Sequence, residues 1–208
     1  MSTPLFTAPS ALTPWITLPA SDESAGRWHD QIQGLALAAA GGVHTEGVSR
    51  FVTRACAMQL TECLPGAFMR FLFAPSIDLD PVLFTVVAVE AEGPSAETQR
   101  SLLAADDLGG FIGQVDDLRE LSIDGYQLLR VDEEPLAASF ESAFAPARVL
   151  MITLATIVRR RLPGIGEVDL YAVARGPQLA TIAAAIVPVI SLLNEWEFDT
   201  SSKGGSRT

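Results

Sequence analysis

The pattern of apolar residues changes once along this chain, at Gly66. Before it, apolar side chains recur at helical spacing and predict helices over 22–39 and 46–64. After it, short apolar runs between turn residues predict strands over 67–73, 82–90, 125–131, 148–159 and 167–174. Since helices and strands are segregated rather than alternating, the predicted fold class is α+β. We expect a two-layer arrangement, a mostly antiparallel sheet packed against an N-terminal helical hairpin and a C-terminal helix.

Capping and turn residues mark where these elements begin and end. Gly41 and Gly42 are expected to close the first helix, and Pro65 with Gly66 the second. The turn 162–166 predicts that the last two strands form a hairpin. Ser95 should cap a short helix over 95–105, and 135–144 should form a helical turn. A final helix is expected over 177–198, bent or split by Pro188.

The ends of the chain differ from its middle. Prolines at every fifth position from Pro4 to Pro19 predict an extended arm over 1–20, and residues 200–208 are expected to be a disordered tail. The region 21–199 is then one domain, consistent with 22.1 kDa. Leu5, Phe6, Trp15 and Ile16 are expected to anchor the arm as a strap on this domain. The alternative is an arm that binds a partner.

The reactive residue types are scarce. Lys203, in the polar tail, is the only lysine, which excludes P-loop, Schiff-base and kinase-type sites that need one inside a folded region. The other 13 basic residues are arginines, typical of a GC-rich bacterial genome. Cys56 and Cys63 lie seven positions apart on a predicted helix, too far for a disulfide, and are expected to be reduced. With no signal-peptide pattern at the start, the expected compartment is the cytoplasm.

Negative charge is concentrated in the middle of the sequence. Between Pro75 and Pro135 there are 14 acidic and three basic residues, a difference of 11 that equals the net charge of −11 for the whole chain. Such a surface repels nucleic acid and anionic lipid and attracts basic partners, although a solvated acidic face is an equally simple interpretation. The candidate partner-binding carboxylates are Asp106, Asp107, Asp116, Asp117, Asp132, Glu133 and Glu134.

Two acidic pairs flank a glycine-rich stretch within this region. Asp106-Asp107-Leu108 recurs as Asp116-Asp117-Leu118, and we interpret 106–117 as a mobile acidic loop. Its spacing does not match a calcium-binding EF-hand loop, so no metal site is predicted.

Arg159, Arg160 and Arg161 form the only basic cluster. It is expected at the exposed end of a strand, where it pairs with the acidic middle of the chain or contacts a partner. His29 and His44 fall in no catalytic motif, and we expect both at or near the surface.

These patterns favour a non-enzymatic, cytoplasmic interaction protein. The expected role is an accessory subunit, chaperone-like factor or immunity-type inhibitor that binds a protein partner or itself. No cofactor and no nucleic-acid partner is expected. No transmembrane segment is expected either, because the longest apolar run, 179–193, is too short to span a bilayer. The alternative is a small-molecule or metal-binding protein, or an enzyme, that uses the carboxylates of 106–117, with His29 as a base.

Overall fold

The computed structural model of the chain describes residues 14–18, 25–61, 66–95, 97, 99, 113–135, 148–162 and 166–195. Several predictions lie outside these residues. They concern the arm before Pro14, the start of the helix predicted over 22–39, Cys63, most of the helix over 95–105, Asp106 and Asp107, the turn after Pro135, and the tail.

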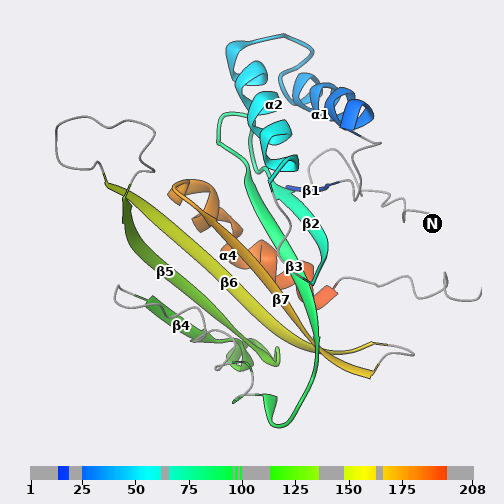
Figure 1. The fold of residues 1–208 in the computed structure, drawn as a ribbon. Coiled ribbons are helices and arrows are strands. Elements are labelled where there is room, and N and C mark those ends of the chain that lie inside the picture. Colours follow the sequence, from blue (N-terminus) through cyan, green and yellow to red (C-terminus); the bar gives the residue numbers. More distant parts are fainter. Residues whose placement is uncertain are drawn as a thin grey trace, which may run out of the picture.

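Seven antiparallel strands form one strongly twisted sheet, in the order β1-β2-β3-β7-β6-β5-β4 (Figure 1). The strands are β1 (Trp15–Thr17), β2 (Ala67–Phe73), β3 (Val82–Glu90), β4 (Gly113–Asp117), β5 (Gly125–Pro135), β6 (Arg148–Leu162) and β7 (Gly166–Gly176). The helices are α1 (Ala25–Ala39), α2 (Glu46–Gln59), α4 (Leu179–Glu195) and the short 3-10 helix η2 (Leu118–Leu121). The predicted α+β class, with a terminal helical hairpin and a closing helix, is confirmed.

The strands confirm some predictions and correct others. β2 and β3 have the predicted bounds, and β6 and β7 form the predicted hairpin, with Leu162 opposite Gly166. β5 continues through Pro135, so the helical turn predicted to start there is wrong at that residue. The mobile loop predicted over 106–117 is also wrong at its end, because 113–117 are strand β4, paired with β5. Neither β4 nor β1 was predicted.

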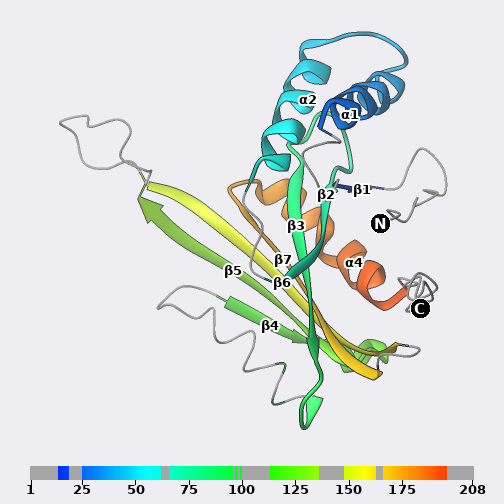
Figure 2. The same ribbon diagram turned by 45° about the vertical axis from the view of Figure 1, so that its right-hand side comes forward.

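One face of the sheet is covered by α4 (Figure 2). Phe71, Phe84, Leu154 and Ala172 belong to the strand positions that point to this face, and they pack with Ile182 and its neighbours on α4. Trp15 of β1 closes one side of this core, with its ring centroid 4.8 Å from that of Phe73 and 5.1 Å from that of Phe84. This aromatic contact explains why a three-residue strand forms at all.

The α1–α2 hairpin packs on the opposite face, at the β1–β2 end of the sheet. Leu72, which alternates with Phe71 and Phe73, lies in a second buried cluster with Trp28, Ile32 and Phe51 of the hairpin. Gly41 and Gly42 have φ values of 66° and 81°, the left-handed conformation that ends α1 where predicted.

Helix α2 ends earlier than predicted. It stops at Gln59, not at Leu64. Arg70 of β2 donates hydrogen bonds to the carbonyl oxygens of Gln59 and Thr61, at 3.2 and 2.7 Å, and so satisfies acceptors at and just after the end of the helix. Thr45 caps the other end of α2 by accepting a bond from the Val48 amide. The hairpin is thereby fixed at both ends of α2.

Candidate functional site

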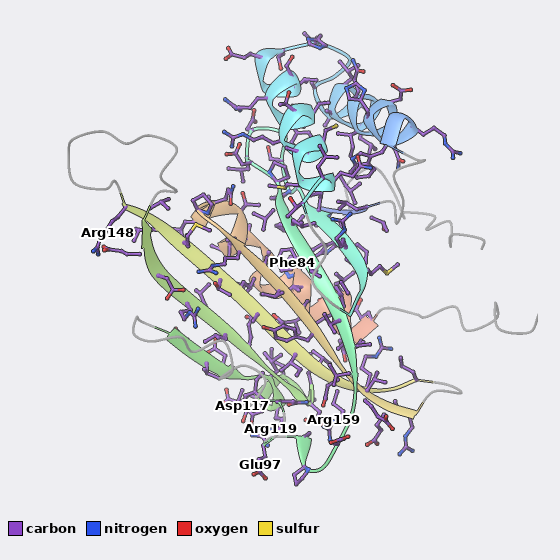
Figure 3. All side chains as sticks on the ribbon, in the orientation of Figure 1. Phe84, Glu97, Asp117, Arg119, Arg148 and Arg159 are labelled. Atoms are coloured by element: carbon purple, nitrogen blue, oxygen red, sulfur yellow. The ribbon has the colours of Figure 1, made fainter. Side chains whose placement is uncertain are left out.

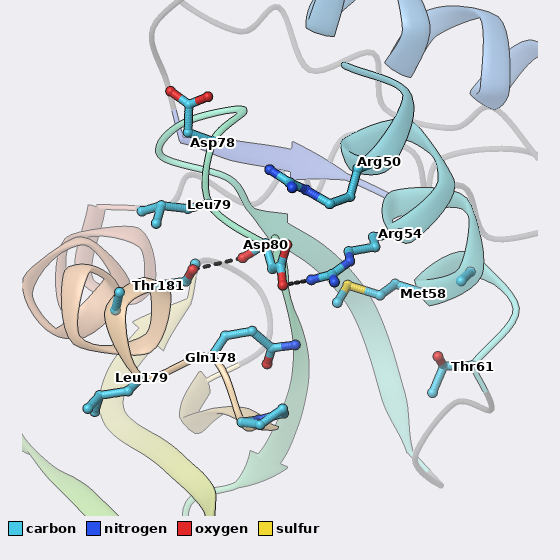
Figure 4. Close-up of a pocket in the computed structure, with 13 residues that line it drawn as sticks. Arg50, Arg54, Met58, Thr61, Asp78, Leu79, Asp80, Gln178, Leu179 and Thr181 are labelled. Atoms are coloured by element: carbon cyan, nitrogen blue, oxygen red, sulfur yellow. Dashed lines mark hydrogen bonds and ion pairs between the residues drawn. The ribbon is translucent and has the colours of Figure 1, made fainter. Parts of the chain in front are cut away.

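An open cleft of about 830 Å³ lies between α2, the loop before β3 and the start of α4 (Figure 4). Three segments far apart in the sequence form it: the outer side of α2, residues 78–80 and residues 177–181. The cleft is thus positioned by the fold, since α2 is fixed on one face of the sheet and α4 on the other.

The wall from α2 is a single stripe of its surface. Arg50, Arg54, Ala57 and Met58 recur at spacings of three and four, which places them on one side of the helix, and Thr61 follows just after the helix ends. The opposite side holds the buried Val48, Phe51, Val52 and Ala55. The residues that anchor α2 in the hairpin therefore also aim its arginines into the cleft.

Two interactions at Asp80 connect the walls of the cleft. Its carboxylate forms an ion pair with Arg54 of α2, and its carbonyl oxygen accepts a 2.7 Å hydrogen bond from the Thr181 hydroxyl of α4 (Figure 4). Thr181 is buried, whereas the side chains of Arg54 and Asp80 are 44% and 31% exposed. Asp80 thus links both helices and still presents a charged pair to solvent.

The remaining lining is mixed in character. Arg50 and Asp78 are exposed, and neither forms an ion pair with any residue that the structure describes. Met58, Leu79 and Leu179 add an apolar surface, of which Leu179 is 60% exposed. The cleft offers separate positive, negative and apolar contacts, which suits a ligand with several chemical groups rather than one ion.

The predicted acidic site residues on β4 lie elsewhere, at the lower end of the sheet (Figure 3). Arg119 donates hydrogen bonds to both carboxylate oxygens of Asp117 and to the Tyr126 hydroxyl, with its guanidinium 5.1 Å from the Tyr126 ring centroid. The side-chain hydrogen bond from Arg119 lowers the pKa of Asp117 from 3.8 to about 2. Asp116 accepts a 2.8 Å bond from Gln114.

The acidic residues of β5 lie at the other end of that strand. Asp132 pairs with Arg130 at 2.9 Å and Glu133 with Arg148 at 3.0 Å. Since Asp117 is opposite Tyr126, Asp132 lies six residues, or about 20 Å, along the strand from it. The side chain of Glu134 is outside the described set. The structure thus separates the predicted carboxylates into two groups and pairs Asp117, Asp132 and Glu133 with arginines.

The three consecutive arginines lie among the last four residues of β6, at a strand end as predicted, but only Arg161 is highly exposed, at 81%, whereas Arg159 is 11% exposed. Arg159 makes two bonds to the fully buried Asp169 of β7, at 2.7 and 3.0 Å, and Arg161 pairs with Glu167 at 3.1 Å. Arg160 donates a 3.0 Å bond to the Leu193 carbonyl. The predicted pairing of the cluster with the acidic middle of the chain is therefore wrong for Arg159 and Arg161, whose partners are on β7.

Asp169 is the centre of a buried polar network. Gln99 donates to its carboxylate at 3.3 Å and to the Asp124 carbonyl at 3.4 Å, while Arg159 also donates to the Gly93 carbonyl at 2.9 Å. These bonds attach the segment after β3 to β6 and β7. The network is a structural support, and the hydrogen bond to Asp169 raises the pKa of Arg159.

Both histidines line a second, smaller hollow of about 200 Å³ between α1 and α2. His29 is exposed beside Asp30, with 3.6 Å between Nδ1 and Oδ1, and His44 is exposed in the interhelical loop. This agrees with the surface positions expected for them. Within the described ranges, no three His, Cys, Asp or Glu side chains are grouped to hold a metal ion.

Comparison of the chain with protein-family models, with curated proteins and with solved structures finds no match. None of the helices built from described residues is both long and apolar enough to cross a membrane.

The sequence analysis did not predict the α2–α4 cleft. The one local signal was the i, i+4 pair Arg50 and Arg54 on the face of α2 opposite its apolar stripe.

Proposed function

We propose that this chain is a non-catalytic binding protein whose α2–α4 cleft holds a segment of a partner protein. The observation that carries the proposal is the composition of the cleft, in which the Arg54–Asp80 pair, Arg50, Asp78 and an exposed leucine face one open volume. Small-molecule sites usually enclose 70–90% of the ligand surface. The walls of this cleft are exposed, so they favour a segment of a partner protein over an enclosed small molecule.

The cleft replaces the acidic surface as the proposed contact region. Asp117, Asp132 and Glu133 each have an arginine partner, so part of the acidic middle third is neutralised within the chain. The Asp117–Arg119 ion pair also disfavours the alternative of a carboxylate-based enzyme or metal site at 106–117. A carboxylate held at a pKa of about 2 is a weak base at neutral pH.

Site-specific photo-crosslinking in the native host tests this proposal. A benzophenone amino acid at Thr61, in the cleft, is expected to capture a defined partner protein. The same group at Leu150, which is 56% exposed on β6, provides the matched control. Introducing Arg50→Glu together with Arg54→Ala should abolish the crosslink from position 61. The absence of a crosslink, or one product common to both positions, would contradict the proposal.

A further inference from the structure

The arginines of the α2–α4 cleft have hydrogen-bond donors that the chain does not use. Arg50 is exposed and forms no ion pair with any residue in the described ranges. Arg54 pairs with Asp80 through Nη1, but a guanidinium has several N–H groups, so Arg54 retains donors for a second acceptor. The α2 wall of the cleft therefore offers positive charge to a ligand.

The aspartates of the cleft, in contrast, already face positive groups of the same chain. Asp80 is the partner of Arg54. Asp78 Oδ1 lies 4.0 Å from the point where a Cβ atom on Gly47 would be, which places this carboxylate beside the first turn of α2. The free amides of a first helical turn carry partial positive charge and attract a carboxylate. A basic ligand would compete with these contacts, whereas an acidic ligand meets free donors.

The spacing of the two arginines suits a single carboxylate. Arg50 and Arg54 are four residues apart on α2, so their Cβ atoms are about 5–6 Å apart. A carboxylate between them can accept hydrogen bonds from both guanidinium groups. Met58 follows on the same wall, and Leu79 and Leu179 lie across the cleft (Figure 4). An apolar side chain next to that carboxylate therefore has a surface to pack on.

We propose, resting on the function proposed above, that the partner segment in this cleft is acidic. One of its carboxylates binds between Arg50 and Arg54, and a neighbouring apolar side chain packs on Met58 and Leu179. Charge complementarity selects this occupant, because the free charged groups of the cleft are donors and both of its aspartates have positive neighbours. The segment has the opposite charge to the basic partner expected from the acidic middle of the sequence.

The net charge of −11 slows the approach of an acidic partner but does not decide the contact within the cleft. At physiological ionic strength, exposed charges more than about 8 Å apart are largely screened from each other. Glu97 and Asp117 lie at the lower end of the sheet, far from α2 (Figures 1 and 3). The groups that act on a bound carboxylate are therefore those of the cleft itself, and we expect weak, reversible binding.

Peptide titration of the purified, isotope-labelled full chain tests the proposal by NMR. The probes are acetyl-Gly-Glu-Leu-Gly-amide and the same peptide with lysine in place of glutamate. At millimolar concentration the glutamate peptide should shift the amide signals of Arg50, Thr61 and Ala180 in the cleft, and leave that of the exposed Leu150 on β6 unchanged. The lysine peptide should not shift the cleft signals. Equal shifts with both peptides, or none with either, would overturn the proposal.

Substitutions at the cleft charges assign the binding to Arg50. Arg50→Gln should weaken the glutamate peptide about two- to fivefold, as expected for an exposed ion pair, and Arg50→Lys should retain binding. Asp78→Asn should bind this peptide at least as tightly as the wild type, because it removes a like charge from the cleft. Arg27→Gln, the same change at an exposed arginine of α1 outside the cleft, is the matched control. Circular dichroism checks that each variant is folded.

Two outcomes of these substitutions contradict an acidic segment. Equal weakening by Arg50→Gln and Arg27→Gln would mean that only the overall charge matters, and weaker binding in Asp78→Asn would mean that the cleft prefers a basic group.

The crosslink from position 61 separates the acidic segment from the function on which it rests. The absence of any crosslink would reject the partner-binding cleft. A crosslink that is insensitive to Arg50→Gln, or whose captured segment contains no acidic residue by mass spectrometry, would reject only the acidic segment and leave the partner-binding function in place.

Discussion

The structure contains two arginine–aspartate pairs in very different surroundings. In Arg159–Asp169 the side chains are 11% and 0% exposed, whereas in Arg54–Asp80 they are 44% and 31% exposed. The first joins neighbouring strands within the sheet, and the second joins α2 to the loop before β3 at the surface of a cleft. The comparison shows that the same ion pair can be a structural support or part of a binding surface, and burial decides which.

The largest expected effect comes from breaking the buried pair. Asp169→Ala leaves Arg159 buried without its carboxylate and removes an acceptor of Gln99, so the free energy of unfolding should fall by about 3–5 kcal/mol. Guanidinium denaturation measures this change. A decrease in the free energy of unfolding below about 1 kcal/mol would show that the Arg159–Asp169 pair does not stabilise the fold.

Replacing both partners tests whether the stability lost in Asp169→Ala comes from the unpaired buried charge of Arg159. The double variant Arg159→Met with Asp169→Leu removes both buried charges, and it should recover most of the stability lost in Asp169→Ala. If the double variant is as unstable as the single one, the network contributes to the free energy of unfolding mainly through the hydrogen bonds to Gln99 and the Gly93 carbonyl.

A smaller effect is expected at the link between α4 and the cleft. Thr181→Val keeps the shape of a buried side chain but removes the hydrogen bond to the Asp80 carbonyl, which should cost about 1 kcal/mol. The loss of this link should also weaken crosslinking from position 61. Thr53→Val, an exposed threonine on α2, serves as the matched control for the stability measurement.

The exposed pair itself should contribute little to stability. Arg54→Ala should change the free energy of unfolding by only about 0–1 kcal/mol, because solvent screens the pair. Its effect should instead appear in partner binding. A loss of several kcal/mol, comparable to that of Asp169→Ala, would remove the distinction between the two pairs.

The sequence predicted the elements that depend on their own apolar pattern. β2 and β3 are apolar runs between turn residues, and both have the predicted bounds. β4 has one large apolar residue, Val115, and becomes a strand through pairing with β5. β5 and β6 extend past their predicted ends through charged residues because cross-strand partners stabilise them, as Arg161 opposite Glu167 shows.

The cleft lies beyond the reach of local sequence patterns for a related reason. Its residues come from 50–61, 78–80 and 177–181, and no motif connects them. Only the fold brings α2 and the start of α4 to the same loop. The charge run that did attract notice, Arg159–Arg161, lies in paired strands, where two of its three members bind carboxylates of β7.

The smallest effect concerns Asp117 and Arg119, an exposed pair that resembles Arg54–Asp80 in its solvent access. The hydrogen bond from Arg119 lowers the pKa of Asp117 to about 2 in the folded chain, against 3.8 without a partner. A depressed carboxyl pKa stabilises the folded state above pH 3.8, and this contribution disappears as the pH falls through about 2. Carboxyl-carbon NMR should therefore give a titration midpoint near 2 for Asp117 and one near 3.8 in Arg119→Gln. A midpoint near 3.8 in the wild type would mean that solvent screens this pair completely, and the acidic end of β4 would then be open to a basic partner.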